Sequence, residues 1–194
     1  MSMTLKNHNI IKDYIEQIKL SIDQVDFLKI ENIFIKLQEM KSNKGTLFIC
    51  GNGGSSGNSS HLANDFIFGT APKGDGLSVE DLSANSAIIT CLANDIGYEY
   101  IFSHQLKVKA NSNDILMVLS GSGNSLNIIK AIETAKKKNM LVIGFLGFDG
   151  GKAKELVDLA IHFNISDMQI SEDMQLIVGH LLMRLFKATA DGEL

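Results

Sequence analysis

The sequence predicts an α/β fold, a three-layer sandwich in which a five-stranded parallel sheet is covered by helices on both faces. Short apolar runs that stop at glycine or serine, such as TLFIC before Gly51 and ILMVL before Ser120, are typical of buried parallel strands. Longer segments, with apolar residues spaced three and four apart, separate these runs and predict helices. Strands and helices that alternate in this way form βαβ units and one parallel sheet.

Length and composition fit one compact domain and exclude several classes of protein. The chain has 194 residues, of which 45% are hydrophobic and 21% charged, as in ordinary globular proteins. A net charge of −4 provides no basic field for nucleic acid. No window reaches about 18 uninterrupted apolar residues, and the N-terminus lacks a signal peptide's apolar stretch. We therefore expect a cytoplasmic protein that binds neither nucleic acid nor a membrane.

Two helices are expected before the first strand, within residues 5–42, and Asp23 or Asp26 could cap the second. Because they precede the sheet, they are not crossovers, and residues 1–45 are expected to form a helical arm for oligomerisation, ahead of a domain at 46–194. Cys50 and Cys91 lie in apolar runs and are expected in the core. The remaining elements are a helix after the first glycine loop, strands at 46–50, 77–82, 115–119, 140–146 and 157–163, and helices at 85–96, 98–110, 126–138 and about 170–188.

Two loops rich in glycine and serine follow strands whose carboxyl ends share one edge of the predicted sheet. The first is Gly51-Asn52-Gly53-Gly54-Ser55-Ser56, and the second is Ser120-Gly121-Ser122-Gly123-Asn124-Ser125. Each could be a turn with helix-capping serines. Alternatively, backbone N–H groups and hydroxyls at a helix N-terminus bind anions. Because both loops lie where ligands of open α/β sheets bind, the sequence predicts a site for a phosphorylated small molecule.

Ionisable side chains on two predicted helices are candidates for chemistry. His61 and Asp65 are four residues apart, so they share one helical face and suit acid–base catalysis, metal ligation or a plain surface pair. Glu172 and His180 on the last helix project about 80° apart, so both can reach one cavity without touching. Asp173 lies closer to the angular position of His180 and competes with Glu172 for that role.

Six segments in order, GNGGS, HLAND, LANDIGY, SGSGNS, GFDGG and SEDMQLIVGH, resemble the sugar isomerase (SIS) fold and, more narrowly, the phosphoheptose isomerases. The resemblance covers nearly the whole chain. It implies a flavodoxin-like SIS sheet and the interconversion of sedoheptulose 7-phosphate and D-glycero-D-manno-heptose 7-phosphate, for lipopolysaccharide or capsule biosynthesis. It also implies a homotetramer with active sites lined by neighbouring subunits, which would give the N-terminal arm its purpose.

The resemblance further implies roles for particular residues. One zinc ion per subunit, with no organic cofactor, would be held by His61, Asp65, Glu172 and His180. The substrate would be bound by two groups of residues besides Asp65 and Glu172. The sugar would be held by Asn52, Gly53, Gly54, Ser55, Asn94 and Asp95, and the phosphate by Ser120, Gly121, Ser122 and Ser125.

Several positions depart from the pattern of this family. Asp65 replaces a glutamate and Glu172 a glutamine, and Gly69 stands where an arginine is usual. Gln169 replaces an aspartate, and Ser120-Gly121-Ser122 replaces Ser-Thr-Ser. A second carboxylate at position 172 should strengthen a divalent cation site. The shorter acid at position 65 changes which hydrogen it can reach, because catalysis is sensitive to displacements of about 1 Å.

Together with the resemblance, the ionisable residues predict an aldose–ketose phosphate isomerase. Asp65 would be the base and His180 the acid, since the reaction moves protons between adjacent carbons and their oxygens. Two alternatives follow from the departures. One is an isomerase of a different phosphosugar. The other is a non-catalytic protein on the same scaffold that binds the replication initiator, as a related bacterial protein does, because a fold does not settle function.

Overall fold

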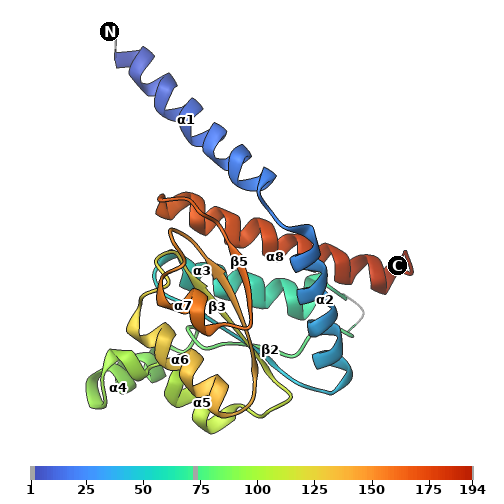
Figure 1. The fold of residues 1–194 in the computed structure, drawn as a ribbon. Helices are drawn as coiled ribbons and strands as arrows, with labels where there is room; N and C mark the ends of the chain where they lie inside the picture. The colour runs from blue at the N-terminus through green and yellow to red at the C-terminus, as the bar shows by residue number, and fades with distance from the viewer. Residues whose placement is uncertain (1–2, 72–73, 194) are drawn as a thin grey trace.

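The structure, a computed structural model that describes residues 3–71 and 74–193, confirms the α/β sandwich (Figure 1). Its five strands are all parallel, in the order β2-β1-β3-β4-β5. Because the chain runs from β1 to β2 on one side and continues from β3 on the other, the order reverses between β1 and β3, which is where open α/β sheets bind ligands. The strands are β1 (Leu47–Gly51), β2 (Val79–Asp81), β3 (Ile115–Ser120), β4 (Leu141–Leu146) and β5 (Leu159–His162).

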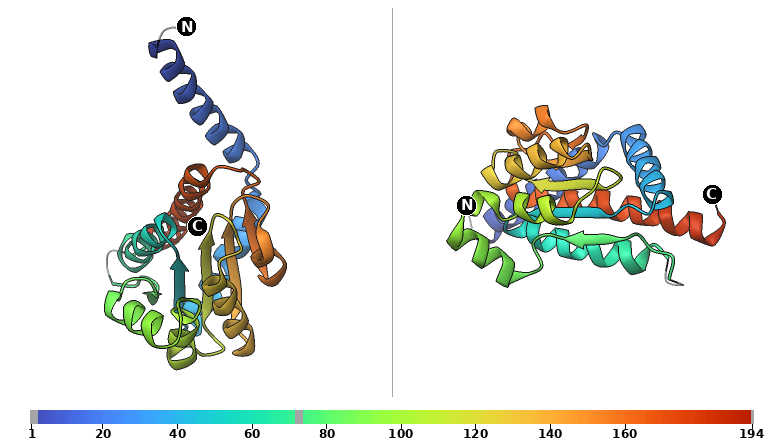
Figure 2. Two further views of the ribbon diagram at one scale, coloured as in Figure 1. Left: turned by 90° about the vertical axis from the view of Figure 1, so that its left-hand side faces the viewer. Right: turned by 90° about the horizontal axis from the view of Figure 1, so that it is seen from below.

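Two apolar cores lie on opposite faces of the sheet. Alternate residues of a strand face opposite sides, so Leu47 and Ile49 of β1 belong to one core, whereas Phe48 and Cys50 belong to the other. The first core lies under α2 (Phe27–Ser42), α3 (Gly54–Asn64) and α8 (Met168–Asp191). The second lies under α5 (Ser103–Lys109), α6 (Leu126–Lys137) and α7 (Gly151–Leu156) (Figure 2).

The two N-terminal helices differ in how they pack. Helix α1 (Met3–Asp23) projects away from the body of the molecule (Figure 1). Helix α2 instead buries Ile33 and Leu37 completely in the core. Asp26 is the residue that caps α2, since its carboxylate accepts from the backbone N–H groups of Leu28 and Lys29 at 3.1 and 3.3 Å.

Three sequence expectations about local structure are wrong. Cys91 is exposed, because α4 (Ser86–Asp95) packs only Ile89, Leu92 and Ala93 against the second core and fully buries none of its residues. The segment expected as one helix at 98–110 is a 3₁₀ turn (Tyr98–Tyr100) followed by α5. Helix α7 was not expected. Cys50 is buried as expected, and its thiol pKa is raised, chiefly by burial and then by the Asp81 carboxylate. In the described part of the chain, no helix combines the length and apolarity that crossing a membrane requires.

Candidate functional site

The loop after β1 is closely packed where it enters α3. A methyl carbon at Gly51 would lie 2.5 Å from the backbone oxygen of Ser55, so only glycine fits there. Gly53 adopts a φ of +56°, in the region that favours glycine, and precedes the first turn of α3. Gly53 and Gly54 are exposed and Ser55 is buried. The backbone at the start of α3 is thus open to a ligand at the carboxyl edge of the sheet.

The loop after β3 is held by its own serines. The Ser120 hydroxyl accepts from the backbone N–H of Gly123 at 3.0 Å, and the Ser122 hydroxyl accepts from that of Asn124 at 3.3 Å. Ser125 occupies the N-cap position of α6, but its side chain makes no capping hydrogen bond. The capping interpretation of this loop therefore does not account for the Ser125 hydroxyl, which remains available at a helix N-terminus.

A partly buried amide pair joins these two loops. Asn52 Nδ2 donates to Asn127 Oδ1 at 2.9 Å, and Asn127 Nδ2 donates back to Asn52 Oδ1 at 2.8 Å. The Tyr98 hydroxyl also donates to Asn52 Oδ1, at 3.0 Å. Asn127 is 1% exposed and was missed in the sequence, where the only signal was a polar residue in the first turn after the second loop. The pair fixes the spacing between the two loops.

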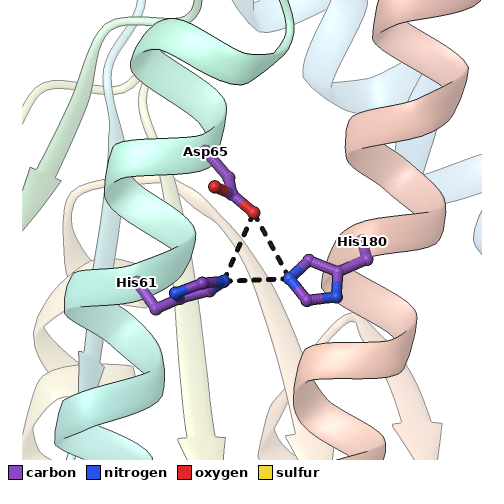
Figure 3. Close-up of side chains that lie close together, drawn as sticks. All are labelled: His61, Asp65 and His180. Atoms are coloured by element: carbon purple, nitrogen blue, oxygen red, sulfur yellow. Dashed lines mark hydrogen bonds and ion pairs between the residues drawn. The ribbon is translucent and has the colours of Figure 1, made fainter.

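His61, Asp65 and His180 converge between α3 and α8 (Figure 3). The two Nε2 atoms are 2.9 Å apart, and Asp65 Oδ2 lies 3.5 Å from that of His61 and 3.3 Å from that of His180. The side chains of His61 and His180 are 49% and 43% exposed, whereas that of Asp65 is 17% exposed. We call these three side chains the His–Asp–His group.

The geometry of the His–Asp–His group fits a zinc ion. Ligand atoms about 2.0–2.1 Å from a tetrahedral zinc are about 3.3 Å from one another. The three separations here are 2.9, 3.3 and 3.5 Å, close to three corners of such a tetrahedron. Among the residues that the structure describes, these three side chains form a group whose ligand atoms lie close enough together to share a metal ion.

Close packing of α3 against α8, which lie side by side in Figures 1 and 2, brings the group together. A methyl carbon at Gly179 would lie 2.2 Å from Leu62 Cδ2, so the helices approach through a glycine beside His180 and a leucine beside His61. One turn earlier, Asn58 Nδ2 donates to Gln175 Oε1 at 3.0 Å, and Gln175 is fully buried. These contacts fix the register of the two helices.

Asp65 lies where the helix changes type. Helix α3 ends at Asn64, and Asp65–Gly69 continues as a single π-helical turn. Such turns are rare and occur frequently at functional sites, because the wider turn re-aims side chains. The periodicity of the sequence does not show this turn, which contains Gly69.

Glu172 does not lie with the His–Asp–His group. Its carboxylate is against Gly54 at the first loop, since a methyl carbon there would be 2.2 Å from Glu172 Oε2. Asp173 is paired elsewhere, because its Oδ2 accepts from the Tyr14 hydroxyl of α1 at 2.5 Å. That hydrogen bond, with a smaller effect of burial, raises the pKa of Tyr14 to about 12. Of the four expected metal ligands, three are together.

The other expected site residues differ in exposure. Asn94 Nδ2 donates to Asp95 Oδ1 at 2.8 Å at the end of α4, and both residues are exposed. The thiol of Cys91 donates to Asp95 Oδ2 at 3.5 Å, which raises the pKa of that thiol. Gly121 is buried, and a methyl carbon on it would lie 2.3 Å from Met168 Sδ.

Comparisons with known proteins agree with this architecture. A family model described as the SIS domain matches residues 13–147. A phosphoheptose isomerase of Helicobacter pylori strain P12 is 34% identical over 167 residues, 86% of each chain. One of Aneurinibacillus thermoaerophilus is 33% identical over 156 residues, 80% of this chain and 79% of that one. A solved phosphoheptose isomerase from Francisella tularensis, 23% identical, has a TM-score of 0.89 over 96% of this chain and 99% of that one, and shows the same fold.

Proposed function

Because the chain belongs to the SIS-domain family, in the branch of the phosphoheptose isomerases, we propose that it interconverts sedoheptulose 7-phosphate and D-glycero-D-manno-heptose 7-phosphate. The observation that carries this proposal is the convergence of His61, Asp65 and His180 between α3 and α8. Helix α3 begins at the glycine-rich loop after β1, where the substrate is expected to bind. The geometry supplies a carboxylate and an imidazole in one place, as proton transfer requires.

The reaction passes through an enediol, and two proton transfers form this intermediate and two more convert it to the product. In the direction from ketose to aldose, Asp65 takes a proton from C1 while His180 gives one to the oxygen of C2. Asp65 then returns a proton to C2 while His180 takes one from the oxygen of C1, so both groups end as they began.

Zinc would be held by His61, Asp65 and His180, and when bound it would polarise the sugar oxygens. Glu172, at Gly54, would contact the substrate at the first loop. There Asn52, Gly53, Gly54 and Ser55 would hold the sugar, with Asn94 and Asp95 nearby. The phosphate would be bound at the second loop by Ser120, Gly121, Ser122 and Ser125, where hydroxyls and a helix N-terminus replace water around the anion.

We further propose a homotetramer that works in the cytoplasm and supplies heptose for lipopolysaccharide or capsule. Exposed apolar side chains support the assembly. Ile10 and Ile11 of the projecting helix α1 are 68% and 56% exposed, and Ile96 beside α4 is 45% exposed. Adjacent exposed apolar side chains such as Ile10 and Ile11, on a helix that projects from the body of the molecule, are typical of subunit interfaces.

The test is turnover of sedoheptulose 7-phosphate, followed by NMR of the substrate's carbon-bound protons, with and without added zinc. Asp65→Asn and His180→Ala should each lower kcat by roughly 10²–10⁴-fold, the usual contribution of an acid or base. Asp75→Asn, which removes an exposed carboxylate paired with Lys41, is the matched control and should leave kcat unchanged. Unchanged turnover in Asp65→Asn, or no isomerisation by the unaltered protein, would refute the proposal.

A further inference from the structure

One carboxylate outside the His–Asp–His group holds the helix that carries His61 and leads directly into Asp65. Asp81 is the last residue of β2, at the carboxyl edge of the sheet. Its Oδ1 accepts from the Ser59 hydroxyl at 2.8 Å and from the backbone N–H of Ser83 at 2.8 Å. Its Oδ2 accepts from the Ser60 hydroxyl. Asp81 therefore ties α3 both to the edge strand and to the loop that follows it.

The two hydroxyls belong to consecutive residues of α3, immediately before His61. Successive helical residues point about 100° apart, so two bonds from them to one carboxylate restrain rotation of the helix about its axis. Ser59 is fully buried, so no water replaces Asp81, and the other acceptor within reach of its hydroxyl is the backbone oxygen of Ser56 at 2.8 Å.

Small rotations of α3 matter because His180 is on a different helix. The ring of His61 extends to roughly 7 Å from the axis of α3, given a Cα radius of about 2.3 Å, so a 10° rotation would move Nε2 by about 1.2 Å. Metal–ligand distances tolerate only about 0.2 Å. Contacts with α8 set the separation and register of the helices, whereas Asp81 acts from the opposite side and sets the rotation.

We infer that Asp81 is a positioning residue, whose carboxylate fixes the rotation of α3 and thereby places His61 and Asp65 opposite His180. The inference rests on the metal-binding role proposed above for the His–Asp–His group. It predicts that Asp81 acts on metal affinity through Ser59 and Ser60, without touching metal or substrate. Loss of a partner hydrogen-bonded to a metal ligand typically lowers metal affinity by about 10- to 100-fold, and we expect Asp81, which bonds the residues next to a ligand, to lie at the lower end of that range.

The experiment compares zinc affinities, measured by competition with a chromogenic chelator, for Asp81→Ala and Asp114→Ala. Asp114 is the matched control, a buried carboxylate that accepts from the backbone N–H groups of Thr46 and Asn111 at 2.8 and 2.6 Å, at the start of β3 and away from the site. Asp81→Ala should lower zinc affinity at least tenfold, and Asp114→Ala by less than twofold. Asp81→Asn, which keeps one acceptor oxygen, should recover part of the loss.

Two further measurements keep the inference testable. If Asp81→Ala does not fold, Ser60→Ala at an exposed position should still lower zinc affinity, and combining it with Asp81→Asn should add little. In metal-free protein, the imidazole NMR signals of His61 and His180 should shift in Asp81→Ala and not in Asp114→Ala, whether or not the protein binds zinc. Equal zinc affinities in Asp81→Ala and the unaltered protein, equal losses in both alanine variants, or unmoved imidazole signals would overturn it. An absence of isomerase activity would refute the proposed reaction alone.

Discussion

Gly179→Ala tests whether the close approach of α3 and α8 sets the geometry of the His–Asp–His group. A methyl carbon at Gly179 would lie 2.2 Å from Leu62 Cδ2, whereas ordinary contact begins at 3.4 Å. The difference between these distances, about 1.2 Å, must be taken up by Leu62 or by the helices, and Leu62 is fully buried. Because metal sites tolerate only about 0.2 Å, we expect zinc affinity to fall at least tenfold.

The same substitution should change the free energy of unfolding much less. Alanine is about 1 kcal/mol more favourable than glycine within a helix. Overpacking a core by one methyl group costs about 1–3 kcal/mol. The net loss is therefore about 0–2 kcal/mol, which leaves most of the chain folded at 25 °C.

Zinc affinity by chelator competition and unfolding free energy by urea titration separate these two effects. Gly57→Ala is the control, because it adds the same methyl group to α3 where no other atom lies within 4 Å, and zinc affinity should stay unchanged. Adding Leu62→Ala to Gly179→Ala removes the clash and should restore affinity. If Gly179→Ala binds zinc within twofold of the unaltered protein, the helix contact does not set the site.

Three further predictions follow from particular contacts. Glu172→Gln should leave zinc affinity unchanged while altering KM, because the carboxylate lies at Gly54; a tenfold loss of affinity would instead make Glu172 a ligand. Gly51→Ala should lower the urea midpoint by an amount equivalent to about 1–3 kcal/mol, since its methyl carbon would lie 2.5 Å from the backbone oxygen of Ser55, and an unchanged midpoint would contradict the tight turn. Spectrophotometric titration should find one tyrosine with a pKa of about 12, which Asp173→Asn should bring back towards 10. Because the pKa of Tyr14 is raised on folding, its contribution to stability should be present below pH 10 and be lost as the pH rises towards 12; a pKa unaffected by Asp173→Asn would contradict this pairing.

Strands of the sheet were predictable because burial on both faces demands uninterrupted apolar residues. The runs at 46–50 and 115–119 differ from β1 and β3 by a single residue at one or both ends. Edge strand β2, whose three residues are all half-buried, gave a weaker signal, and the short helix α7 gave none. Cys91 was misplaced because an apolar helix indicates burial but does not show whether the cover is this chain's own core.

The sequence by itself determined the sheet, the two loops at its carboxyl edge and the shared face of His61 and Asp65, because these follow from periodicities of 2 and 3.6 residues along one stretch of chain. Only the tertiary structure decided that His180 joins that pair while Glu172 lies at Gly54. It also decided that Asn127 and Asp81 brace the surrounding loops and helix. Helical periodicity fixes the direction of a side chain about its own axis, whereas the residue opposite it depends on how two distant helices pack, here through Gly179 and Leu62.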